Sequence, residues 1–140
     1  MRTERTVFDT SLYIAALRGP VELRLITQER QLWMSAVVLE ELYAGAGSQE
    51  TRTIELLQRS FVATKRLLVP SLMDWKTAGL LLARVARKHG YEHIGRGRLT
   101  NDALIAVSSA RLGATVLTLN ASDFARLAEF HNFQWEIAKL

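Results

Sequence analysis

Hydrophobic positions along the chain fall either in short apolar runs or in longer stretches with an apolar residue every three or four positions. Short runs are typical of buried strands, and the periodic stretches are typical of amphipathic helices. The runs predict strands at residues 6–8, 31–34, 66–69 and 114–119, with an alternating edge strand at 132–137. The periodic stretches predict helices at residues 11–18, 21–29, 36–45, 48–63, 72–88, 101–112 and 123–128.

Strands that alternate with helices predict an α/β fold, because parallel strands need crossover connections. We therefore expect a three-layer α/β/α fold with a central, mainly parallel sheet of about four to five strands. A length of 140 residues fits one domain, residues 1–140. Three tryptophans fall on predicted strands or apolar helix faces, so we expect them in the core; they are Trp33, Trp75 and Trp135.

Helix boundaries are marked by residues that cap helix ends. Ser35, Ser71 and Thr100 each precede a predicted helix, and Thr10 or Ser11 stands before the first one. The longest helix, 72–88, carries a series of apolar positions, namely Leu72, Trp75, Leu82, Val85 and Ala86. Between it and the next helix, residues 90–99 contain three glycines and two arginines, which predicts a loop.

Acidic residues follow the predicted strands, at the edge of an α/β sheet where ligands usually bind. Asp9 ends the first strand, Asp102 lies in the first turn of the helix after Thr100, and Asp123 follows the fourth strand. Each of these aspartates also lies near a helix start, where backbone amides favour an anion. For Asp102 or Asp123 alone, helix capping is an alternative explanation. Asp9 directly follows an apolar strand, and Thr10 and Ser11 could cap the next helix without it.

A further acid comes from the helix that follows the second strand, where Glu40 and Glu41 are adjacent. Neighbouring helix positions differ in direction by about 100°. Glu41 shares its face with Val38 and Leu42, whereas Glu40 lies at the margin of that face. An acid within an apolar face needs a partner, so the helix phase favours Glu41 as the functional candidate and Glu40 as a surface charge.

Composition narrows the chemistry that these acids can perform. The chain has no cysteine, which excludes disulfides, thiolate nucleophiles and cysteine-bound metals. The formal net charge is +4, with 14 Arg and 4 Lys against 4 Asp and 10 Glu. A basic surplus is compatible with a polyanionic partner. No stretch approaches the ~18 apolar residues of a membrane span and no signal peptide is recognised, so we expect a soluble, cytoplasmic protein with no membrane contact.

Several carboxylates in one cleft repel one another unless one stays protonated or a cation neutralises them. Oxygen ligands without nearby His or Cys favour Mg²⁺ or Mn²⁺. Such an ion acidifies a bound water and stabilises charge on phosphate oxygens. An acidic cleft in a basic protein is therefore the arrangement expected of a metal-dependent nuclease, with arginines holding the nucleic-acid backbone.

Four segments, in order, resemble the motifs of PIN-domain ribonucleases. They are Val7-Phe8-Asp9-Thr10-Ser11, the stretch 35–45 with Glu41 in the acid position, Thr100-Asn101-Asp102-Ala103-Leu104-Ile105-Ala106, and Thr118-Leu119-Asn120-Ala121-Ser122-Asp123-Phe124. Their order, spacing and total length agree with the family over essentially the whole chain. Within that family the chain looks like VapC, the toxin of toxin–antitoxin pairs.

The resemblance implies a Mg²⁺-dependent endoribonuclease (Mn²⁺ as the alternative ion), a hydrolase that inhibits translation by cutting a structured RNA. It also implies a VapB-like antitoxin and a toxin homodimer. By carry-over, the metal-holding acids are Asp9, Glu41, Asp102 and Asp123, and the supporting polar residues are Thr10, Thr118 and Asn120. Asn120 stands where some relatives carry another acid, so the resemblance leaves one or two metal ions open.

Other interpretations stay open from sequence alone. The chain is alternatively a catalytically inactive PIN-like module that binds RNA or protein, or, with weaker support, a phosphatase or switch that uses an aspartate nucleophile. The basic loop with Arg96 and Arg98 is either an RNA contact or a solvated connection. For the homodimer, small and aliphatic helix positions are the expected contacts, namely Ala78, Gly79, Leu82 and Ala83.

Overall fold

Five strands form one parallel sheet in the order β3-β2-β1-β4-β5. The structure, a computed structural model, describes residues 3–19, 22, 27, 29–92 and 98–139, without the side chain of Arg98. The strands are β1 (Glu4–Phe8), β2 (Arg30–Ser35), β3 (Leu67–Leu68), β4 (Thr115–Thr118) and β5 (Gln134–Ile137). The predicted α/β fold is confirmed, and the tail strand does lie at the sheet edge.

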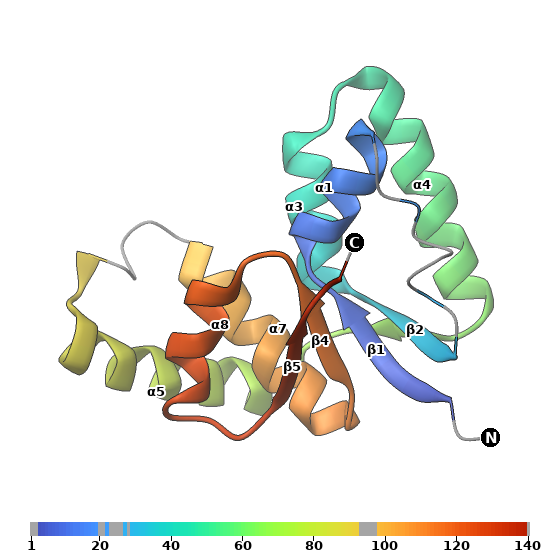
Figure 1. Cartoon of the computed structure of the whole chain (residues 1–140). Helices are drawn as coiled ribbons and strands as arrows, with labels where there is room; N and C mark the ends of the chain where they lie inside the picture. Colours follow the sequence, from blue (N-terminus) through green and yellow to red (C-terminus); the bar gives the residue numbers. More distant parts are fainter. Residues whose placement is uncertain (1–2, 20–21, 23–26, 28, 93–97, 140) are drawn as a thin grey trace.

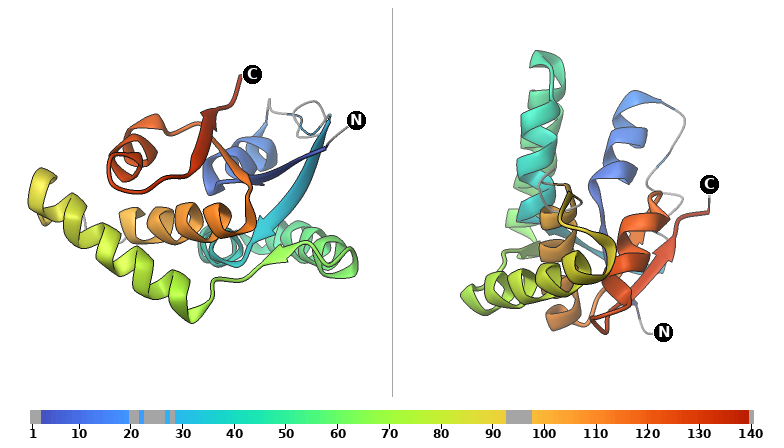
Figure 2. Two further views of the ribbon diagram at one scale, coloured as in Figure 1. Left: turned by 90° about the horizontal axis from the view of Figure 1, so that it is seen from below. Right: turned by 90° about the vertical axis from the view of Figure 1, so that its left-hand side faces the viewer.

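Helices flank this sheet in two groups (Figure 1). The helices of the described residues are α1 (Thr10–Arg18), α3 (Ala36–Gly45), α4 (Ser48–Ala63), α5 (Leu72–His89), α7 (Arg98–Leu112) and α8 (Ala121–Ala128). Helices α1, α3 and α4 pack together, and α5, α7 and α8 form the second group. Both views of Figure 2 show α5 lying alongside α7. No described helix is both long and apolar enough to cross a membrane.

The core lies between the strands and these helices and is formed by apolar side chains from both. Val7, Phe8, Val116 and Leu117 are almost fully buried at the sheet centre. Strand β1 is central because it pairs in parallel with β2 on one side and β4 on the other. The residue that follows β1 therefore stands in the middle of the sheet's carboxyl edge.

Two predicted caps form as expected. The Ser35 hydroxyl accepts a hydrogen bond from the amide of Val37 at 3.2 Å, at the start of α3. The Ser71 hydroxyl accepts from the amide of Asp74 at 3.1 Å, and the Asp74 carboxylate accepts from the Ser71 amide at 2.9 Å. This reciprocal arrangement is a capping box, which fixes the first turn of α5.

Other predicted boundaries were wrong. Helix α7 begins at Arg98, so Thr100 lies inside the helix and the predicted loop ends two residues earlier. Neither Thr10 nor Ser11 caps α1, because Asp9 occupies the N-cap position. Most of the predicted helix 21–29 lies outside the described residues.

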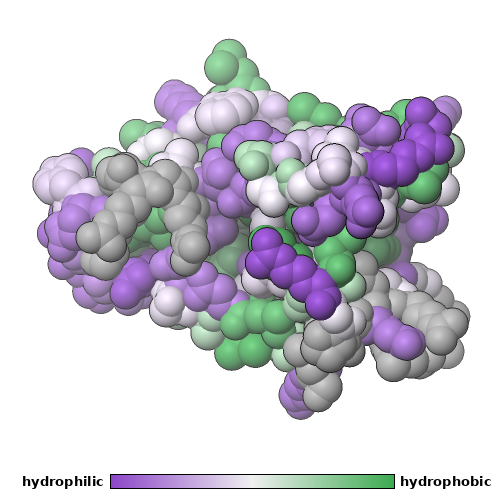
Figure 3. Space-filling view, turned by 90° about the horizontal axis from the view of Figure 1, so that it is seen from above, coloured by the Kyte–Doolittle hydropathy of each residue, from purple (hydrophilic) through white to green (hydrophobic). Residues whose placement is uncertain are grey.

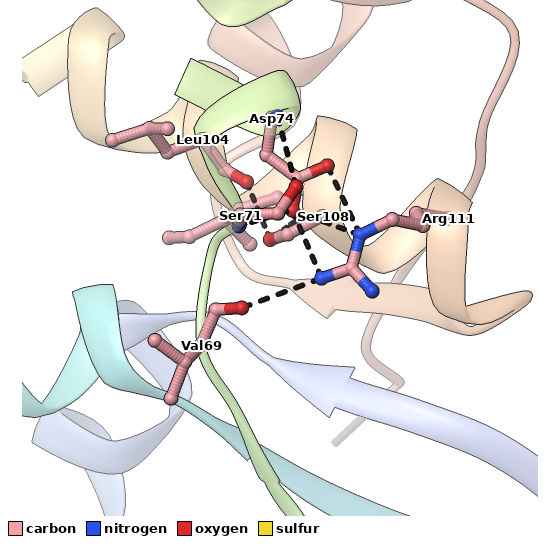
Figure 4. Close-up of polar contacts among 7 residues, drawn as sticks. Val69, Ser71, Asp74, Leu104, Ser108 and Arg111 are labelled. Atoms are coloured by element: carbon pink, nitrogen blue, oxygen red, sulfur yellow. Dashed lines mark hydrogen bonds and ion pairs between the residues drawn. The ribbon is translucent and has the colours of Figure 1, made fainter.

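An ion pair between half-exposed Arg111 and buried Asp74 connects α7 to the start of α5 (Figure 4). Arg111 near the end of α7 donates to both carboxylate oxygens of Asp74, at 2.9 and 3.1 Å, and to the carbonyl of Val69 at 3.3 Å. The Asp74 side chain is only 4% exposed. Burial alone would raise the pKa of Asp74, but the hydrogen bonds from Arg111 and Ser71 outweigh it and hold the pKa below its ordinary value.

The outer face of α5 differs from its prediction. Trp75 is 56% exposed and Leu72 is 87% exposed, so neither belongs to the core, whereas Trp33 and Trp135 pack against it. Ala78 and Leu82, predicted at a dimer interface, are buried inside the molecule. A partner cannot reach these two side chains without opening the core.

Candidate active site

The carboxyl edge of the sheet brings together residues that are far apart in the chain. Asp9 follows β1, and its amide donates to the carbonyl of Leu117 in β4 at 3.0 Å. This hydrogen bond continues the pairing of β1 with β4 beyond the end of β1. Strand β4 ends at Thr118, so Asp9 and Thr118 are neighbours at this edge.

A hollow of about 460 Å³ opens at this edge. It is lined by Asp9, Thr10, Ser11, Ile14, Glu41, Asp102, Leu119 and Asn120. Figure 3 looks down on this side of the molecule, where hydrophilic and hydrophobic side chains are mixed. The acids in the lining come from three separate helices or their start, α1, α3 and α7. Three of the four predicted acids therefore share one hollow.

Asp9 is the most restrained of these acids. Its side chain accepts hydrogen bonds from the hydroxyls of Ser11 and Thr118, each at 2.5 Å. Burial raises the pKa of the Asp9 carboxyl above its ordinary value, and these two hydrogen bonds oppose that rise. The Asp9 side chain does not form the usual N-cap hydrogen bond to α1. The backbone amides of Leu12 and Ser11 are nevertheless near enough to favour the charged form of Asp9.

Ser11 joins the site although sequence reasoning gave it only a capping role. Its hydroxyl donates to Asp9 and accepts from the amide of Leu119 at 3.1 Å. One side chain thus fixes the first acid and connects it to the backbone after β4. The signal in the sequence was a hydroxyl two residues after an acid at a strand–helix junction, a spacing that serves side-chain bonding as well as capping.

The choice between Glu40 and Glu41 has a clear structural counterpart. Glu41 lines the hollow, and its carboxylate accepts from the Thr10 hydroxyl at 2.7 Å. Glu40 is exposed and does not line the hollow. Thr10, predicted as a supporting polar residue, therefore links the start of α1 to the acid on α3.

Asp102 reaches the hollow from the second turn of α7, because that helix starts at Arg98. It is only 7% exposed. The residues around it on α7, Ala103 and Ala106, are fully buried. Their burial holds this part of the helix against the core and thereby sets the position of Asp102.

Asp123 does not line the hollow, unlike the other three acids. Its carboxylate accepts from the Asn120 side-chain amide at 3.2 Å and pairs with Arg126 at 3.1 Å. Arg126 partly neutralises Asp123, which makes it a weaker ligand for a cation. Asn120 does line the hollow, so Asp123 contacts the site through that amide. The Thr118 hydroxyl donates to Asp9 and also accepts from the backbone amide of Asn120 at 2.8 Å.

The donors of the hollow suit a hard divalent cation. Its three acids offer carboxylate oxygens, and no His or Cys lines it in the part of the chain that the structure describes. Mg²⁺ and Mn²⁺ prefer oxygen ligands. Within the described residues, no three acidic or histidine side chains lie close enough to surround one ion. Binding of one ion by all three acids would therefore require their side chains to move closer together.

The predicted basic loop cannot be placed relative to this hollow. Arg96 lies outside the described residues, and only the backbone of Arg98 is described, as the first residue of α7. An RNA contact by these two arginines stays a prediction.

Known proteins resemble this chain along most of its length. The sequence model of the PIN domain matches residues 6–130. Ribonuclease VapC1 from Rickettsia felis is 31% identical over 123 residues, which are 86% of this chain and 89% of that protein. Ribonuclease VapC from Rickettsia bellii is 29% identical over 126 residues, or 88% and 90% of the two chains.

Solved structures of similar fold come from toxin–antitoxin complexes. VapBC2 from Rickettsia felis, bound to promoter DNA, matches with a TM-score of 0.66 and 20% identity over 96% of this chain and 99% of the other. VapBC-5 from Mycobacterium tuberculosis matches with a TM-score of 0.54 and 27% identity over 97% and 98%. With a parallel sheet in the order 3-2-1-4-5, acids gathered at its carboxyl edge and these relatives, the chain belongs to the PIN-domain family, in its VapC group.

Proposed function

We propose that this chain is a metal-dependent endoribonuclease that acts in the cytoplasm as a VapC-like toxin and inhibits translation. The observation that carries the proposal is the convergence of Asp9, Glu41 and Asp102 on one hollow from three parts of the chain. Ribonuclease activity is in the names of the two Rickettsia relatives. Among the described residues, neither a cysteine nor a histidine lines the hollow, so its carboxylates are the groups that would supply the chemistry.

Asp9, Glu41 and Asp102 would hold Mg²⁺ or Mn²⁺, with Asp123 as a peripheral member through Asn120. When bound, such an ion acidifies a water and stabilises charge on the scissile phosphate. Ser11 and Thr118 orient the Asp9 carboxyl and favour its charged form, and Thr10 orients Glu41 toward the hollow. These hydroxyls reduce the freedom of the acids before substrate binds, which lowers the cost of assembling the reactive geometry.

The proposal predicts that Asp9→Asn or Asp102→Asn lowers the rate of Mg²⁺-dependent RNA cleavage by at least 100-fold. Each change removes a negative oxygen ligand with almost no change in shape. Gel analysis of end-labelled RNA, with and without EDTA, measures the effect, and the growth of cells that express each variant tests the toxin role. Glu55→Gln, in an exposed pair on α4, is a charge-matched control away from the hollow. Persistent Mg²⁺-dependent cleavage in both active-site variants would contradict the proposal.

A catalytically inactive PIN-like module is the second candidate, and the spacing of the acids favours it. No three of them, among the described residues, lie close enough to share an ion. A pure binding module would retain RNA in both Mg²⁺ and EDTA without forming cut products. The same cleavage gels therefore separate this candidate from the enzyme.

Two partners follow from the proposed toxin role. VapBC and FitAB complexes among the structural neighbours support a VapB-like antitoxin as one partner. For the homodimer, exposed apolar side chains near the start of α5 replace the buried Ala78 and Leu82 as the proposed contacts; they are Val69, Leu72, Met73 and Trp75. Large exposed apolar groups gathered on one helix are typical of protein–protein contacts, so we place the dimer contact there.

A further inference from the structure

A second recess lies on the outside of the α5–α7–α8 group, away from the acids. One hollow of about 280 Å³ and another of about 520 Å³ share three lining residues, Arg84, Arg87 and Phe130. We call the joined recess the α5–α8 groove and define it by Leu80, Arg84, Arg87, Lys88, Phe130 and His131. It runs from the second half of α5 to the turn after α8.

The α5–α8 groove is basic, and its two arginines are not paired with described residues of the protein itself. Of the residues that the structure describes, no acidic one lines either hollow. Lys88 is paired with Glu129 at 2.8 Å, whereas neither Arg84 nor Arg87 forms a hydrogen bond or ion pair with any residue that the structure describes. Both arginine side chains are exposed, so their five-donor guanidinium groups are available to a ligand.

Helix stability explains only part of this charge. Arg87 and Lys88 lie in the last turn of α5, where positive charge is favourable to the helix dipole. Arg84 lies one turn earlier, three and four residues before those two cations. Like charges at these spacings repel each other on a helix surface. The position of Arg84 therefore requires a reason outside the helix, and an anionic ligand supplies one.

The groove also presents an aromatic surface between its cations. The Phe130 ring is partly buried against the core and lies 6.0 Å from the Lys88 ammonium. Guanidinium groups bind phosphates as forks, and aromatic rings provide stacking surfaces for bases of single-stranded RNA. Phosphate donors beside an aromatic ring fit a nucleic-acid strand better than an acidic peptide, which offers no bases to stack.

Helix α8 connects this groove to the acidic hollow. The helix starts directly after Asn120, which lines the hollow, and ends two residues before Phe130. Its eight residues correspond to a length of about 12 Å. Figure 1 shows α8 beside α5 and α7, with its two ends at different levels of the molecule. An RNA that extends a few nucleotides beyond the cleaved bond can therefore contact both places.

We propose that the α5–α8 groove binds the phosphate backbone of RNA outside the active site, with Arg84 and Arg87 as the phosphate contacts. The idea rests on the proposed ribonuclease function, because it takes RNA as the substrate. It adds a positioning surface that favours extended, structured RNA over short fragments.

Binding of a fluorescein-labelled, 40-nucleotide RNA hairpin tests the groove in EDTA, where metal-dependent cleavage cannot interfere. The Arg84→Gln/Arg87→Gln variant should weaken binding about tenfold at moderate salt. The slope of log K against log salt should fall in magnitude by about 1.4 to 1.8, since each of the two lost phosphate contacts removes a slope of about 0.7 to 0.9. The Arg84→Lys/Arg87→Lys variant keeps both positive charges and should retain most of the slope. Thermal unfolding of both variants, in the same buffer, shows whether a loss of binding comes from a loss of folded protein.

The matched control is Arg52→Gln/Arg59→Gln, which removes the same charge from exposed positions on α4. Equal loss of binding in this control, or unchanged binding in Arg84→Gln/Arg87→Gln, would overturn the proposal. Labelled poly-L-glutamate is a second probe. If Arg84→Gln/Arg87→Gln weakens binding of poly-L-glutamate but not of the RNA hairpin, the groove binds an acidic protein segment and the RNA proposal is wrong.

The catalytic variant Asp102→Asn separates failure of the groove from failure of the proposed function. If Asp102→Asn binds the hairpin with the same dependence on Arg84 and Arg87, the groove holds whether or not the wild-type protein cleaves RNA. If the wild-type protein cleaves RNA in Mg²⁺ while the groove variant binds normally, the ribonuclease proposal holds and the groove proposal is wrong.

Discussion

Buried Asp9 depends on hydroxyl groups that the protein places around it. Burial favours the neutral acid, and the hydroxyls of Ser11 and Thr118 favour the carboxylate. A small change in this balance moves the pH at which Asp9 becomes charged. The pH dependence of cleavage therefore reports on single hydroxyls near the acid.

Thr118→Val tests this balance without a large change in volume. Loss of a hydrogen bond to a charged group costs about 1.5–3 kcal/mol. Without the Thr118 hydroxyl, which favours the carboxylate, the pKa of Asp9 should therefore rise further. Because the charged form is the proposed ligand, the acid limb of the pH–rate profile should move to higher pH.

Thr115→Val is the control for that experiment. Thr115 lies at the opposite end of β4 and donates to Glu4, so the same substitution there should leave the acid limb unchanged. An acid limb that is identical in Thr118→Val and the wild-type protein would show that this hydroxyl does not control Asp9.

Sequence reasoning located the acids but not all of their partners. Asp9, Glu41 and Asp102 follow from strand ends and helix phase, which are local properties. The bridge from Ser11 to Leu119 joins residues 108 positions apart, and nothing local encodes it. The pairing of Asp123 with Arg126 spans three residues on one helix, so its spacing in the sequence could have indicated a neutralised acid.

At the scale of elements, the Asp74–Arg111 pair connects two helices that belong to different parts of the site. Helix α7 carries Asp102, and α5 carries the cations of the α5–α8 groove. Arg111 contacts Asp74 where α5 starts, and it also binds the carbonyl of Val69 after β3. The pair therefore limits sliding of α7 relative to α5.

Asp74→Asn should destabilise the protein by about 2–3 kcal/mol at pH 7, because a hydrogen-bonded charge pair loses one partner. The folded-state pKa of Asp74 is lowered from 3.8, so its ionisation stabilises the native state above the unfolded pKa. This stabilisation is lost as the pH falls through the lower, folded pKa. The difference between the two proteins in urea unfolding should be constant above about pH 5 and should close below pH 3.8.

Glu55→Gln is the control for this change. Glu55 forms an exposed pair with Arg52 at 3.9 Å on α4, and pairs of that kind contribute about 0.5 kcal/mol or less. Equal and pH-independent effects of both substitutions would contradict a special role for the Asp74–Arg111 pair.

Boundaries of elements were predictable where local chemistry sets them. Ser35 and Ser71 cap their helices because a hydroxyl directly precedes each one. Thr100 has the same signature, but α7 begins two residues earlier and buries Leu99, so packing decides that start. For Trp75, helix phase gives the direction of the side chain but not whether another element covers it.

At the scale of the whole molecule, the apolar face at the start of α5 has the properties of a contact surface. Leu72, Met73 and Trp75 are 87%, 63% and 56% exposed. Trp75→Glu should convert a homodimer to monomer at micromolar concentration, as measured by light scattering. The exposed Leu56 on α4 gives the control Leu56→Glu, which should remain dimeric. A wild-type protein that is monomeric at this concentration would contradict the proposed dimer.

The hydrogen bond between Thr118 and Asp9 spans 109 residues and has a consequence for synthesis. Asp9 is made well before its partners at β4. Thr118 ends that strand, and Leu119, whose backbone amide donates to Ser11, directly follows it. The acidic hollow therefore cannot form on a nascent chain until β4 has been made and has paired with β1. A protein proposed to inhibit translation thus gains its active geometry only after the ribosome has made β4 of its own chain.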